Sequence, residues 1–354
     1  MTAPVALLSI GTADAPYDMP QATVAEVARS LFQHRFPQFD RMAKVFDTAG
    51  IQHRQSVMPI DWYITPRKWP ERTEAYVSGA VDLFSRAAEN ALANAGLTGP
   101  EVDIIVTVSS TGIATPSLEA RAMARLGFRS DAARIPVFGL GCAGGVTGLA
   151  IASRMARASP GAVVLLVAVE VCTMSFRMED LTKADIVATA LFGDGAAACV
   201  LRCGAGGGED GFAHVEATAE HTWPDTLDIM GWRVEPDGLG VIFARAIPPF
   251  AREHLRPAMD KMLGSNGQRI EDVDRFICHP GGMKVIDAME ASLSMDQGAL
   301  DHERAVLADH GNMSAPTVLY VLDRARRAGL PPRSVVTALG PGFTASTVTL
   351  SNAA

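Results

Sequence analysis

Residues 135–148, Ile135-Pro-Val-Phe-Gly-Leu-Gly-Cys142-Ala-Gly-Gly-Val-Thr-Gly148, contain the pattern that decides the fold of this chain. The stretch predicts a strand, a tight turn of small residues and then a helix. A cysteine at a helix N-terminus lies near the positive end of the helix dipole, which lowers the pKa of a thiol and favours the nucleophilic thiolate. Cys142 is therefore the first candidate catalytic residue, and the glycines beside it let a substrate carbonyl approach the backbone closely.

Alternating strands and helices surround this stretch. Residues 103–109 and 163–169 are continuous apolar runs of strand length, a pattern typical of strands covered on both faces. Helical patterns lie between and beside them, at residues 74–95, 116–126 and 146–158. We therefore expect an α/β chain with a central, mostly parallel sheet.

The second half of the chain repeats features of the first. Gly193-Asp-Gly195 precedes a strand of small and β-branched residues, and Gly340-Pro-Gly342 precedes another. The helices expected near Cys142 and near Asn312 both open with small residues and continue apolar on nearly every face, as buried helices do. The pattern predicts two related halves around a central layer, with both helix starts directed at one site.

A glycine-rich segment separates the two halves. The segment runs from Cys203 to Gly211 and is the one strong shift of composition in the chain. We place the domain boundary there, with an N-terminal half at residues 1–210 that carries Cys142. The C-terminal half, residues 211–354, carries His279 and Asn312.

Composition excludes several classes of protein. The chain has 354 residues, 48% of them hydrophobic, and a formal net charge of −8. That composition excludes a disordered or fibrous chain, and the absence of any Lys/Arg run argues against nucleic acid or an anionic membrane as the main partner. No stretch reaches the length of a membrane span, and the N-terminus reads as a first strand, not as a signal peptide. The five cysteines include no CxxC pair, which favours reduced thiols over disulfides or a zinc site. Reduced thiols in turn favour a cytoplasmic location.

Two further residues carry chemistry. His279 stands where a short apolar strand ends at Pro-Gly-Gly, a suitable place for a general base or an oxyanion donor. Asn312 precedes an apolar helix, so it is either the N-cap of that helix or an amide that contacts a ligand. A Cys, His and Asn set supports cysteine proteolysis or thioester chemistry. Acyl transfer from a thioester is favoured, because the site is built from buried helix starts in a duplicated frame.

The chain resembles a known family over nearly its whole length. Five motifs occur in the family's order: Gly141-Cys142-Ala-Gly-Gly145, Ala190-Leu-Phe192-Gly-Asp-Gly-Ala-Ala-Ala198, His279-Pro-Gly-Gly282, Gly311-Asn312-Met-Ser314 and Gly340-Pro-Gly342. With this set the chain resembles the type III polyketide synthases, the chalcone synthase-like branch of the thiolase superfamily. Other segments are similar to the bacterial alkylpyrone and alkylresorcinol synthases: Val45-Phe-Asp-Thr-Ala-Gly-Ile51, Met58-Pro-Ile-Asp-Trp-Tyr63, Trp69-Pro-Glu-Arg72 and Met230-Gly-Trp232.

The resemblance implies a fold and a mechanism. The fold is the thiolase-like five-layered αβαβα arrangement of two related halves. Cys142 is implied as the nucleophile that takes an acyl group from a CoA starter. His279 and Asn312 are implied to hold the thioester oxygen of malonyl-CoA and to stabilise the enolate left after decarboxylation. His279 is also implied to keep Cys142 as a thiolate through an ion pair.

The resemblance also implies the walls of the cavity. Phe192 and Phe243 match two gate phenylalanines whose apolar faces favour loss of the malonyl carboxylate. The substrate pocket is implied at Ser110, Thr111, Thr115, Cys172, Ser175 and Ser314. Cys172 stands where plant enzymes usually carry threonine, and its compact side chain suits a tunnel for a medium or long acyl chain. One departure is Ala338-Leu339 before Gly340, where the family has Gly-Phe.

CoA binding and partners follow from the same resemblance. Arg41 and Lys44 fall near the basic residues at the CoA entrance, and Gly281 and Gly282 are implied to contact CoA. Acyl-CoA and malonyl-CoA are the expected small-molecule partners, a homodimer is the expected assembly, and no metal or redox cofactor is expected. The expected activity is an acyltransferase that condenses malonyl-CoA units repeatedly onto an acyl-CoA and cyclises the product to an alkylpyrone or alkylresorcinol.

Three alternatives remain open at this point. A malonyl-primed, tetrahydroxynaphthalene-type synthase is the alternative within the family. A ketoacyl-ACP synthase III shares a Cys, His and Asn set but makes a single condensation on acyl carrier protein. A catalytically inactive relative that acts as a binding partner belongs to a different class, and the intact set of Cys142, His279 and Asn312 argues against it.

Overall fold

The computed structural model describes residues 4–36, 38–176, 178, 182–204 and 211–352. The principal strands are β1 (Val5–Asp14), β4 (Ile104–Val108), β5 (Ala133–Val137), β6 (Val163–Val171), β7 (Asp194–Cys203), β8 (Ala213–Thr222), β11 (Arg275–Cys278), β12 (Arg333–Gly340) and β13 (Thr344–Asn352). The shorter strands are β2 (Tyr17–Asp18), β3 (Gln55–Ser56), β9 (Met230–Glu235) and β10 (Gly238–Phe243). The helices are α1 (Gln21–Phe32), α2 (Phe39–Thr48), α3 (Ile60–Tyr63), α4 (Trp69–Asn94), α5 (Leu118–Leu126), α6 (Gly144–Ala158), α7 (Lys183–Leu191), α8 (Ile247–Gly264), α9 (Met283–Ser292), α10 (Asp301–His310) and α11 (Thr317–Gly329).

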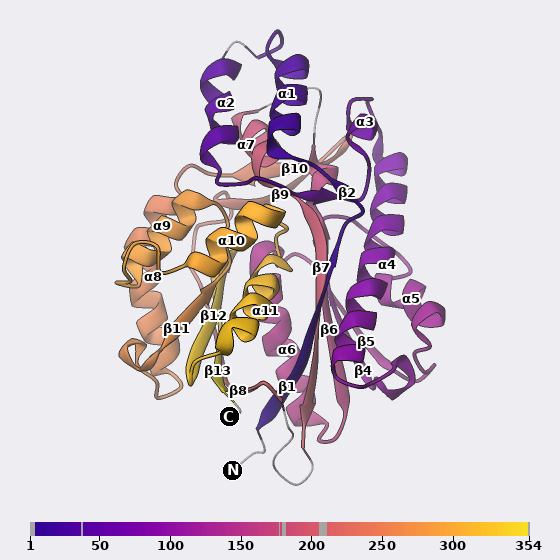
Figure 1. Ribbon diagram of the computed structural model, residues 1–354, viewed down its shortest axis with the longest axis vertical. Coiled ribbons are helices and arrows are strands. Elements are labelled where there is room, and N and C mark those ends of the chain that lie inside the picture. Colours follow the sequence, from indigo (N-terminus) through magenta and orange to yellow (C-terminus); the bar gives the residue numbers. More distant parts are fainter. Residues whose placement is uncertain (1–3, 37, 177, 179–181, 205–210, 353–354) are drawn as a thin grey trace.

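The structure has five layers, as the sequence predicts. The large sheet has the strand order β11-β12-β13-β8-β1-β7-β6-β4-β5, so the pairing of β1 with β8 joins the two halves. Helix α4 packs on the outer face of the N-terminal half, and α8 packs on the outer face of the C-terminal half. Helices α6 and α11 lie between the two halves and contact strands of both (Figure 1).

The two halves end in the same way, which confirms the repeat. The strand β7 starts at Asp194, inside Gly193-Asp-Gly195, and β13 starts just after Gly340-Pro-Gly342. Each of these strands pairs antiparallel with the strand before it in its own half, β6 or β12. The proposed boundary at residue 210 lies outside the described residues.

The direction of the strands differs from the prediction. Among the described residues only the pairs β4–β5, β4–β6 and β11–β12 are parallel, and the other five pairs of the large sheet are antiparallel. The expectation of a mostly parallel sheet was therefore wrong. Its basis was the continuous apolar character of the strands, which reports only that both faces are covered by helices. Here the five layers cover both faces of antiparallel strands as well.

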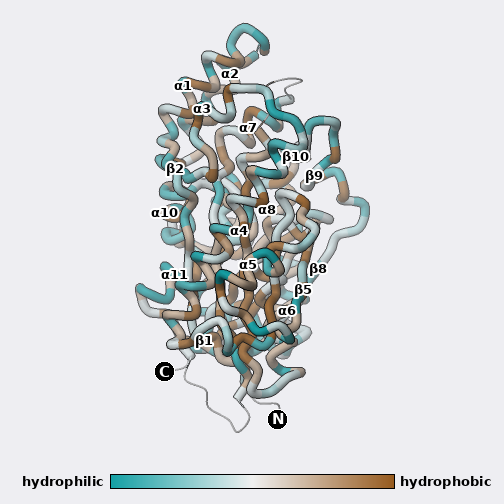
Figure 2. The backbone as a smooth tube through the Cα atoms, turned by 90° about the vertical axis from the view of Figure 1, so that its right-hand side faces the viewer, coloured by the Kyte–Doolittle hydropathy of each residue, from teal (hydrophilic) through white to brown (hydrophobic). Residues whose placement is uncertain are grey.

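The central helices α6 and α11 are buried, as expected for helices that are apolar on nearly every face. Nine of the first ten residues of α6 are among its buried residues, and the first seven residues of α11 are all buried. Figure 2 shows hydrophobic segments through the middle of the molecule and hydrophilic segments along its outline. Two buried helices that start near the same point bring their N-terminal ends to one region.

A smaller layer covers that region. Helices α1, α2 and α7 lie together beyond the ends of the sheet strands, and the β9–β10 hairpin lies beneath them (Figure 1). Among the described residues no helix is both long and apolar enough to cross a membrane.

Candidate active site

Cys142 lies in a tight turn immediately before α6. A single 3₁₀ turn, Gly141–Ala143, leads directly into the helix. The hydroxyl of Ser110 accepts hydrogen bonds from the backbone N–H groups of Gly139 (3.1 Å) and Gly141 (3.3 Å), which fixes the turn. Gly141 has φ +49°, and a Cβ there would lie 2.7 Å from Pro341. The Gly-Pro-Gly loop of the C-terminal half therefore packs against the turn of the N-terminal half that carries Cys142.

His279 follows the last residue of β11. Its backbone N–H donates to the Thr337 carbonyl of β12 (2.9 Å), and its side chain is buried. Neither ring nitrogen has a hydrogen-bond partner among the described residues. Burial lowers the pKa of His279 to about 3, so the isolated imidazole is neutral at pH 7.

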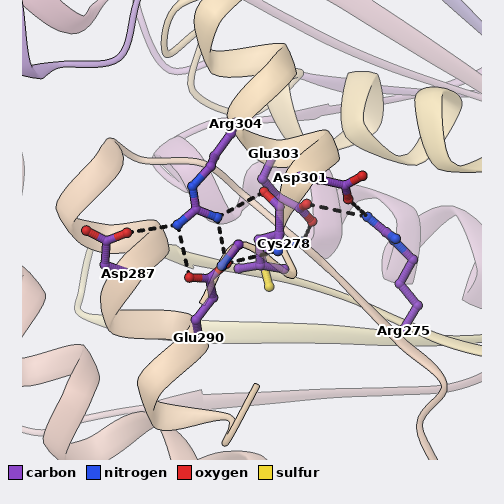
Figure 3. Close-up of polar contacts among 9 residues, drawn as sticks. Arg275, Cys278, Asp287, Glu290, Asp301, Glu303 and Arg304 are labelled. Atoms are coloured by element: carbon purple, nitrogen blue, oxygen red, sulfur yellow. Dashed lines mark hydrogen bonds and ion pairs between the residues drawn. The ribbon is translucent and has the colours of Figure 1, made fainter. Parts of the chain in front are cut away.

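A buried polar cluster supports the strand that carries His279. Figure 3 shows Glu303 of α10 next to Cys278, and a Glu303 carboxylate oxygen accepts the backbone N–H of Cys278 (2.8 Å). This N–H lies on the free edge of β11, so the carboxylate replaces a neighbouring strand. In the same cluster the Arg304 guanidinium donates to both oxygens of Glu290 (2.6 and 2.9 Å).

Asn312 is oriented by two hydrogen bonds of its amide. Its Oδ1 accepts from the Ser314 N–H (2.8 Å), and its Nδ2 donates to the Gly281 carbonyl (3.2 Å). The helix α11 begins only at Thr317 with Pro316 as its N-cap, so the N-cap interpretation of Asn312 was wrong. Asn312 instead makes a turn with its own side chain, and Ser314 takes φ +60° in that turn. The Asn312 side chain also interacts with the Cys142 thiol.

The main chain joins Asn312 to Phe192. The Asn312 N–H donates to the Leu191 carbonyl (2.8 Å), and the Gly193 N–H donates to the Asn312 carbonyl (3.1 Å). This short parallel bridge is formed between residues 120 positions apart in the chain. We call Phe192, Asn312 and the two hydrogen bonds between their segments the gate junction.

The three candidate catalytic residues meet. Cys142, His279 and Asn312 line one small cavity together with Phe243. An adjoining cavity is lined by Cys142, Phe192, Phe243 and Ser314. Both gate candidates and one of the predicted pocket residues therefore lie beside the thiol. Met230, Trp232 and Pro341 complete this wall.

The electrostatics of the thiol differ from the prediction. Burial, with a smaller contribution from the negative charge of Glu170, raises the pKa of Cys142 to about 11, although hydrogen bonds with Ser314 and Asn312 act in the opposite direction. The expected lowering by the helix start is outweighed, because desolvation disfavours a lone thiolate more strongly than the first turn of α6 favours it. A thiolate therefore needs a cation beside it, and His279, in the same cavity, is the group that can supply one.

A second, apolar cavity lies behind Phe192. Its lining includes residues of α1 together with Cys172, Ser175, Phe176, Phe192 and the buried Arg54. Cys172 is fully buried, and the Ser175 hydroxyl donates to the Cys172 carbonyl (2.7 Å). Because Phe192 belongs to the walls of both cavities, this side chain separates the apolar cavity from Cys142.

Other predicted residues lie elsewhere. Thr111 donates its hydroxyl to Glu170 (2.7 Å) and borders a small separate cavity. Thr115 is exposed and lies in none of the cavity walls described above, so its assignment to the pocket stays a prediction. Arg41 and Lys44 are exposed, three residues apart on α2. Gly281 borders the cavity of Cys142, and Gly282 precedes α9.

Glu170 is a site residue that the sequence reasoning missed. It is fully buried near the end of β6 and accepts from the Ser110 N–H (2.9 Å) and the Thr111 hydroxyl. Burial raises its pKa to about 7. A lone carboxylate inside the apolar run Val163–Val171 was the available signal, because an unpaired acid is rare within a buried strand.

Comparisons with known proteins agree with this geometry. The family profile "Chalcone and stilbene synthases, N-terminal domain" matches residues 2–206, and the profile of the C-terminal domain matches residues 214–353. A 1,3,6,8-tetrahydroxynaphthalene synthase of Streptomyces peucetius subsp. caesius is 38% identical over 97% of this chain and 92% of its own length. A 3,5-dihydroxyphenylacetyl-CoA synthase of Amycolatopsis balhimycina is 31% identical over 75% of this chain and 72% of its own length. The crystal structure of 1,3,6,8-tetrahydroxynaphthalene synthase from Streptomyces coelicolor A3(2) has a TM-score of 0.91 at 28% identity and covers 98% of this chain and 99% of that one.

A duplicated five-layered fold with a cysteine, a histidine and an asparagine around one cavity defines a thiolase-like acyltransferase. The chain belongs to the chalcone and stilbene synthase family and is a type III polyketide synthase. This membership sets aside the ketoacyl-ACP synthase III alternative.

Proposed function

We propose that the protein condenses malonyl-CoA units repeatedly onto a medium- or long-chain acyl-CoA starter and cyclises the product to an alkylpyrone or alkylresorcinol. The observation that carries this proposal is the apolar cavity behind Phe192. Its walls are formed largely by aliphatic and aromatic side chains of α1, Ile60, Tyr63 and Phe176. An alkyl chain loses contact with water in such a cavity, which contributes about 0.8 kcal/mol for each CH₂ group.

The residues divide the reaction between them. The Cys142 thiol passes its proton to His279, and the thiolate attacks the acyl-CoA carbonyl. The acyl–CoA thioester bond breaks, and CoA leaves as the free thiol with the proton from His279. The Asn312 Nδ2 and the His279 ring then donate to the thioester oxygen of malonyl-CoA, where negative charge collects when CO₂ leaves. The apolar rings of Phe192 and Phe243 disfavour the malonyl carboxylate and so favour its loss. The resulting carbanion attacks the acyl group on Cys142 and returns the thiolate. CoA thioesters are the only small molecules that this chemistry requires.

The starter preference is tested by mass spectrometry of the products. Purified protein receives malonyl-CoA and acyl-CoA starters from C2 to about C20. Products whose mass follows the starter support the proposal. Cys172→Phe fills the start of the apolar cavity and is expected to shift the preference to shorter starters, whereas the size-matched Cys172→Ser keeps the long ones. Unchanged preference for long chains in Cys172→Phe would show that the chain lies elsewhere.

A malonyl-primed synthase is the second candidate. Its support is the likeness to 1,3,6,8-tetrahydroxynaphthalene synthases in sequence and in structure. The same experiment separates the two: one product of constant mass, formed with malonyl-CoA alone and unaffected by added starters, would establish malonyl priming and overturn the first proposal.

We also propose that the protein acts as a homodimer. Strand β5 is at the edge of the large sheet, and Phe138 and Ile113 beside it are 61% and 58% exposed. Both side chains border a cavity of about 420 Å³, which also contains the buried Glu119 with one unpartnered carboxylate oxygen. A second copy on this face covers the apolar side chains and meets the loop at Thr115. We expect Phe138→Glu to halve the mass measured by light scattering, and an unchanged mass would place the interface elsewhere.

A further inference from the structure

Arg54 is a buried cation with an unusual set of partners. Its side chain is 2% exposed, and no carboxylate lies within ion-pair distance of it among the described residues. One terminal nitrogen donates to the carbonyls of Thr189 (2.5 Å) and Phe192 (3.2 Å), and the other donates to the side chain of Gln21. A guanidinium that binds carbonyls at the C-terminal end of α7 also meets the negative end of the helix dipole.

Gln21 completes the same arrangement. It is the first residue of α1, it is buried, and its amide donates to the Ala190 carbonyl (3.1 Å) and to the Phe46 carbonyl (3.3 Å). The end of a helix leaves its last carbonyls without intrahelical partners. Here Arg54 and Gln21 take the carbonyls of Thr189, Ala190 and Phe192, and the backbone of Asn312 takes that of Leu191.

The position of Arg54 is itself fixed from two sides. Its backbone pairs with Met19, through bonds of 2.7 and 3.3 Å. The preceding residues Gln52 and His53 both donate to the Ala308 carbonyl of α10 (2.8 and 2.9 Å), four residues before Asn312 in the chain. Arg54 therefore connects the end of α7, the start of α1 and the helix that leads to Asn312.

We infer that Arg54 and Gln21 are positioning residues for the gate junction: together they hold the end of α7 so that the Phe192 ring and the Asn312 amide keep a fixed relative placement beside Cys142. This inference rests on the decarboxylating role proposed for Phe192 and Asn312. Neither Arg54 nor Gln21 lines the cavities that contain Cys142, so neither contacts malonyl-CoA beside the thiol. Arg54 also borders the apolar cavity behind Phe192, and for that reason the test below uses malonyl-CoA without a starter.

The test measures two reactions of the same protein. The first is decarboxylation of malonyl-CoA alone, expressed per Cys142 thiol titrated with iodoacetamide. The second is the rate of that alkylation itself. Gln21→Met removes the amide at similar side-chain length, and we expect a decarboxylation rate on the order of tenfold lower, because displacements of about 1 Å can cost up to about 100-fold. The alkylation rate stays within about twofold, because Ser110 and Pro341 hold the Cys142 turn independently.

Further variants keep the test decisive. Arg54→Lys retains the cation but loses the planar fork, and it is expected to lower decarboxylation in the same way. Asp323→Asn is the structural control, since it removes a buried carboxylate that binds Arg326 and Arg327 on α11 without contacting the junction. It is expected to leave both rates unchanged.

A double-variant cycle shows whether Gln21 acts through Phe192. If it does, Gln21→Met combined with Phe192→Ala decarboxylates no more slowly than Phe192→Ala alone. Fully additive losses would overturn the inference, as would an unchanged decarboxylation rate or a parallel fall of both rates. Because no starter is used, failure of the starter proposal leaves this result intact, whereas a wild-type protein that does not decarboxylate malonyl-CoA would contradict both the gate role and the inference.

Discussion

The two halves of the protein contribute differently prepared groups to one cavity. The N-terminal half contributes Cys142 in a turn fixed by Ser110 and Pro341, with a thiol that burial keeps protonated. The C-terminal half contributes Asn312, whose amide is already oriented, and His279, whose ring nitrogens have no partner among the described residues. Under the proposed mechanism, this difference predicts that the acyl-holding step and the malonyl step are separable, and that His279 is the group they share.

Cys142→Ala removes the thiol that the N-terminal half contributes and has the largest expected effect. Product formation falls by at least about 10⁴-fold, since the thiol that is proposed to hold the acyl chain is gone. Decarboxylation of malonyl-CoA continues, because Asn312 and His279 are untouched. Mass spectrometry and CO₂ release measure the two reactions. Full-length product from this variant would remove Cys142 from the mechanism.

His279→Ala tests the group that the two halves share. Burial alone drives Cys142 towards a pKa of about 11 and His279 towards about 3, so each is neutral by itself. Transfer of the thiol proton to the ring creates two opposite charges side by side, which stabilise each other in a dry cavity. We expect alkylation of the wild-type thiol by iodoacetamide to vary little between about pH 6 and 9.

In His279→Ala the thiolate has lost its cation. Its population then increases tenfold per pH unit up to the pKa of about 11, and alkylation at pH 8 is about 1,000-fold slower than in the wild type. Identical pH profiles for the two proteins would show that His279 does not hold the thiolate.

Asn312→Ala removes an amide donor of the C-terminal half and leaves Cys142 in place. Loss of one pre-oriented donor to the developing enolate lowers malonyl-CoA decarboxylation by about 100-fold. Alkylation of Cys142 is expected to change by less than tenfold, since the amide affects the thiol pKa only as a minor contributor. The comparison would be contradicted by decarboxylation at the wild-type rate.

Glu303→Ala tests the support of the strand that carries His279 and has the smallest expected effect on activity. The variant leaves the Cys278 N–H without its acceptor, which lowers the free energy of unfolding by about 1–3 kcal/mol, while activity changes by less than about threefold because Thr337 still fixes His279. Urea denaturation at several pH values measures the loss.

The pH dependence of that loss has a definite sign. Burial raises the Glu303 pKa from 4.5 to about 7, so between these values the folded protein holds a proton that the unfolded chain releases. The stability contributed by Glu303 is therefore fully present below about pH 4.5 and declines as the pH rises to about 7. A difference between wild type and variant that grows with pH would contradict this assignment.

The sequence motifs predicted the candidate site correctly, whereas the apolar runs did not predict the direction of the strands in the sheet. Gly-Asp-Gly and Gly-Pro-Gly before two strands predicted the two halves, because a repeated turn and strand pattern is local information. The apolar runs did not reveal strand direction, since a covered strand looks the same in either direction. The proximity of Cys142, His279 and Asn312 was predicted, and the structure brings them to one cavity.

The positions of other residues depended on contacts between segments that are distant in the chain. Thr115 was assigned to the pocket from the resemblance, but its loop is exposed in the single chain. Asn312 was left open as an N-cap, and the start of α11 at Thr317 excludes that interpretation. Arg54 gave no signal in the sequence, because its partners at the end of α7 are about 135 residues away.

The family, the duplicated frame and the three candidate catalytic residues could be predicted from the amino-acid sequence alone, because each depends on short motifs of small and reactive residues. The tertiary structure decided the direction of the strands, the raised pKa of the thiol and the gate junction. Burial, charge and hydrogen-bond partners at those places come from segments that meet only when the chain folds, so no local pattern encodes them.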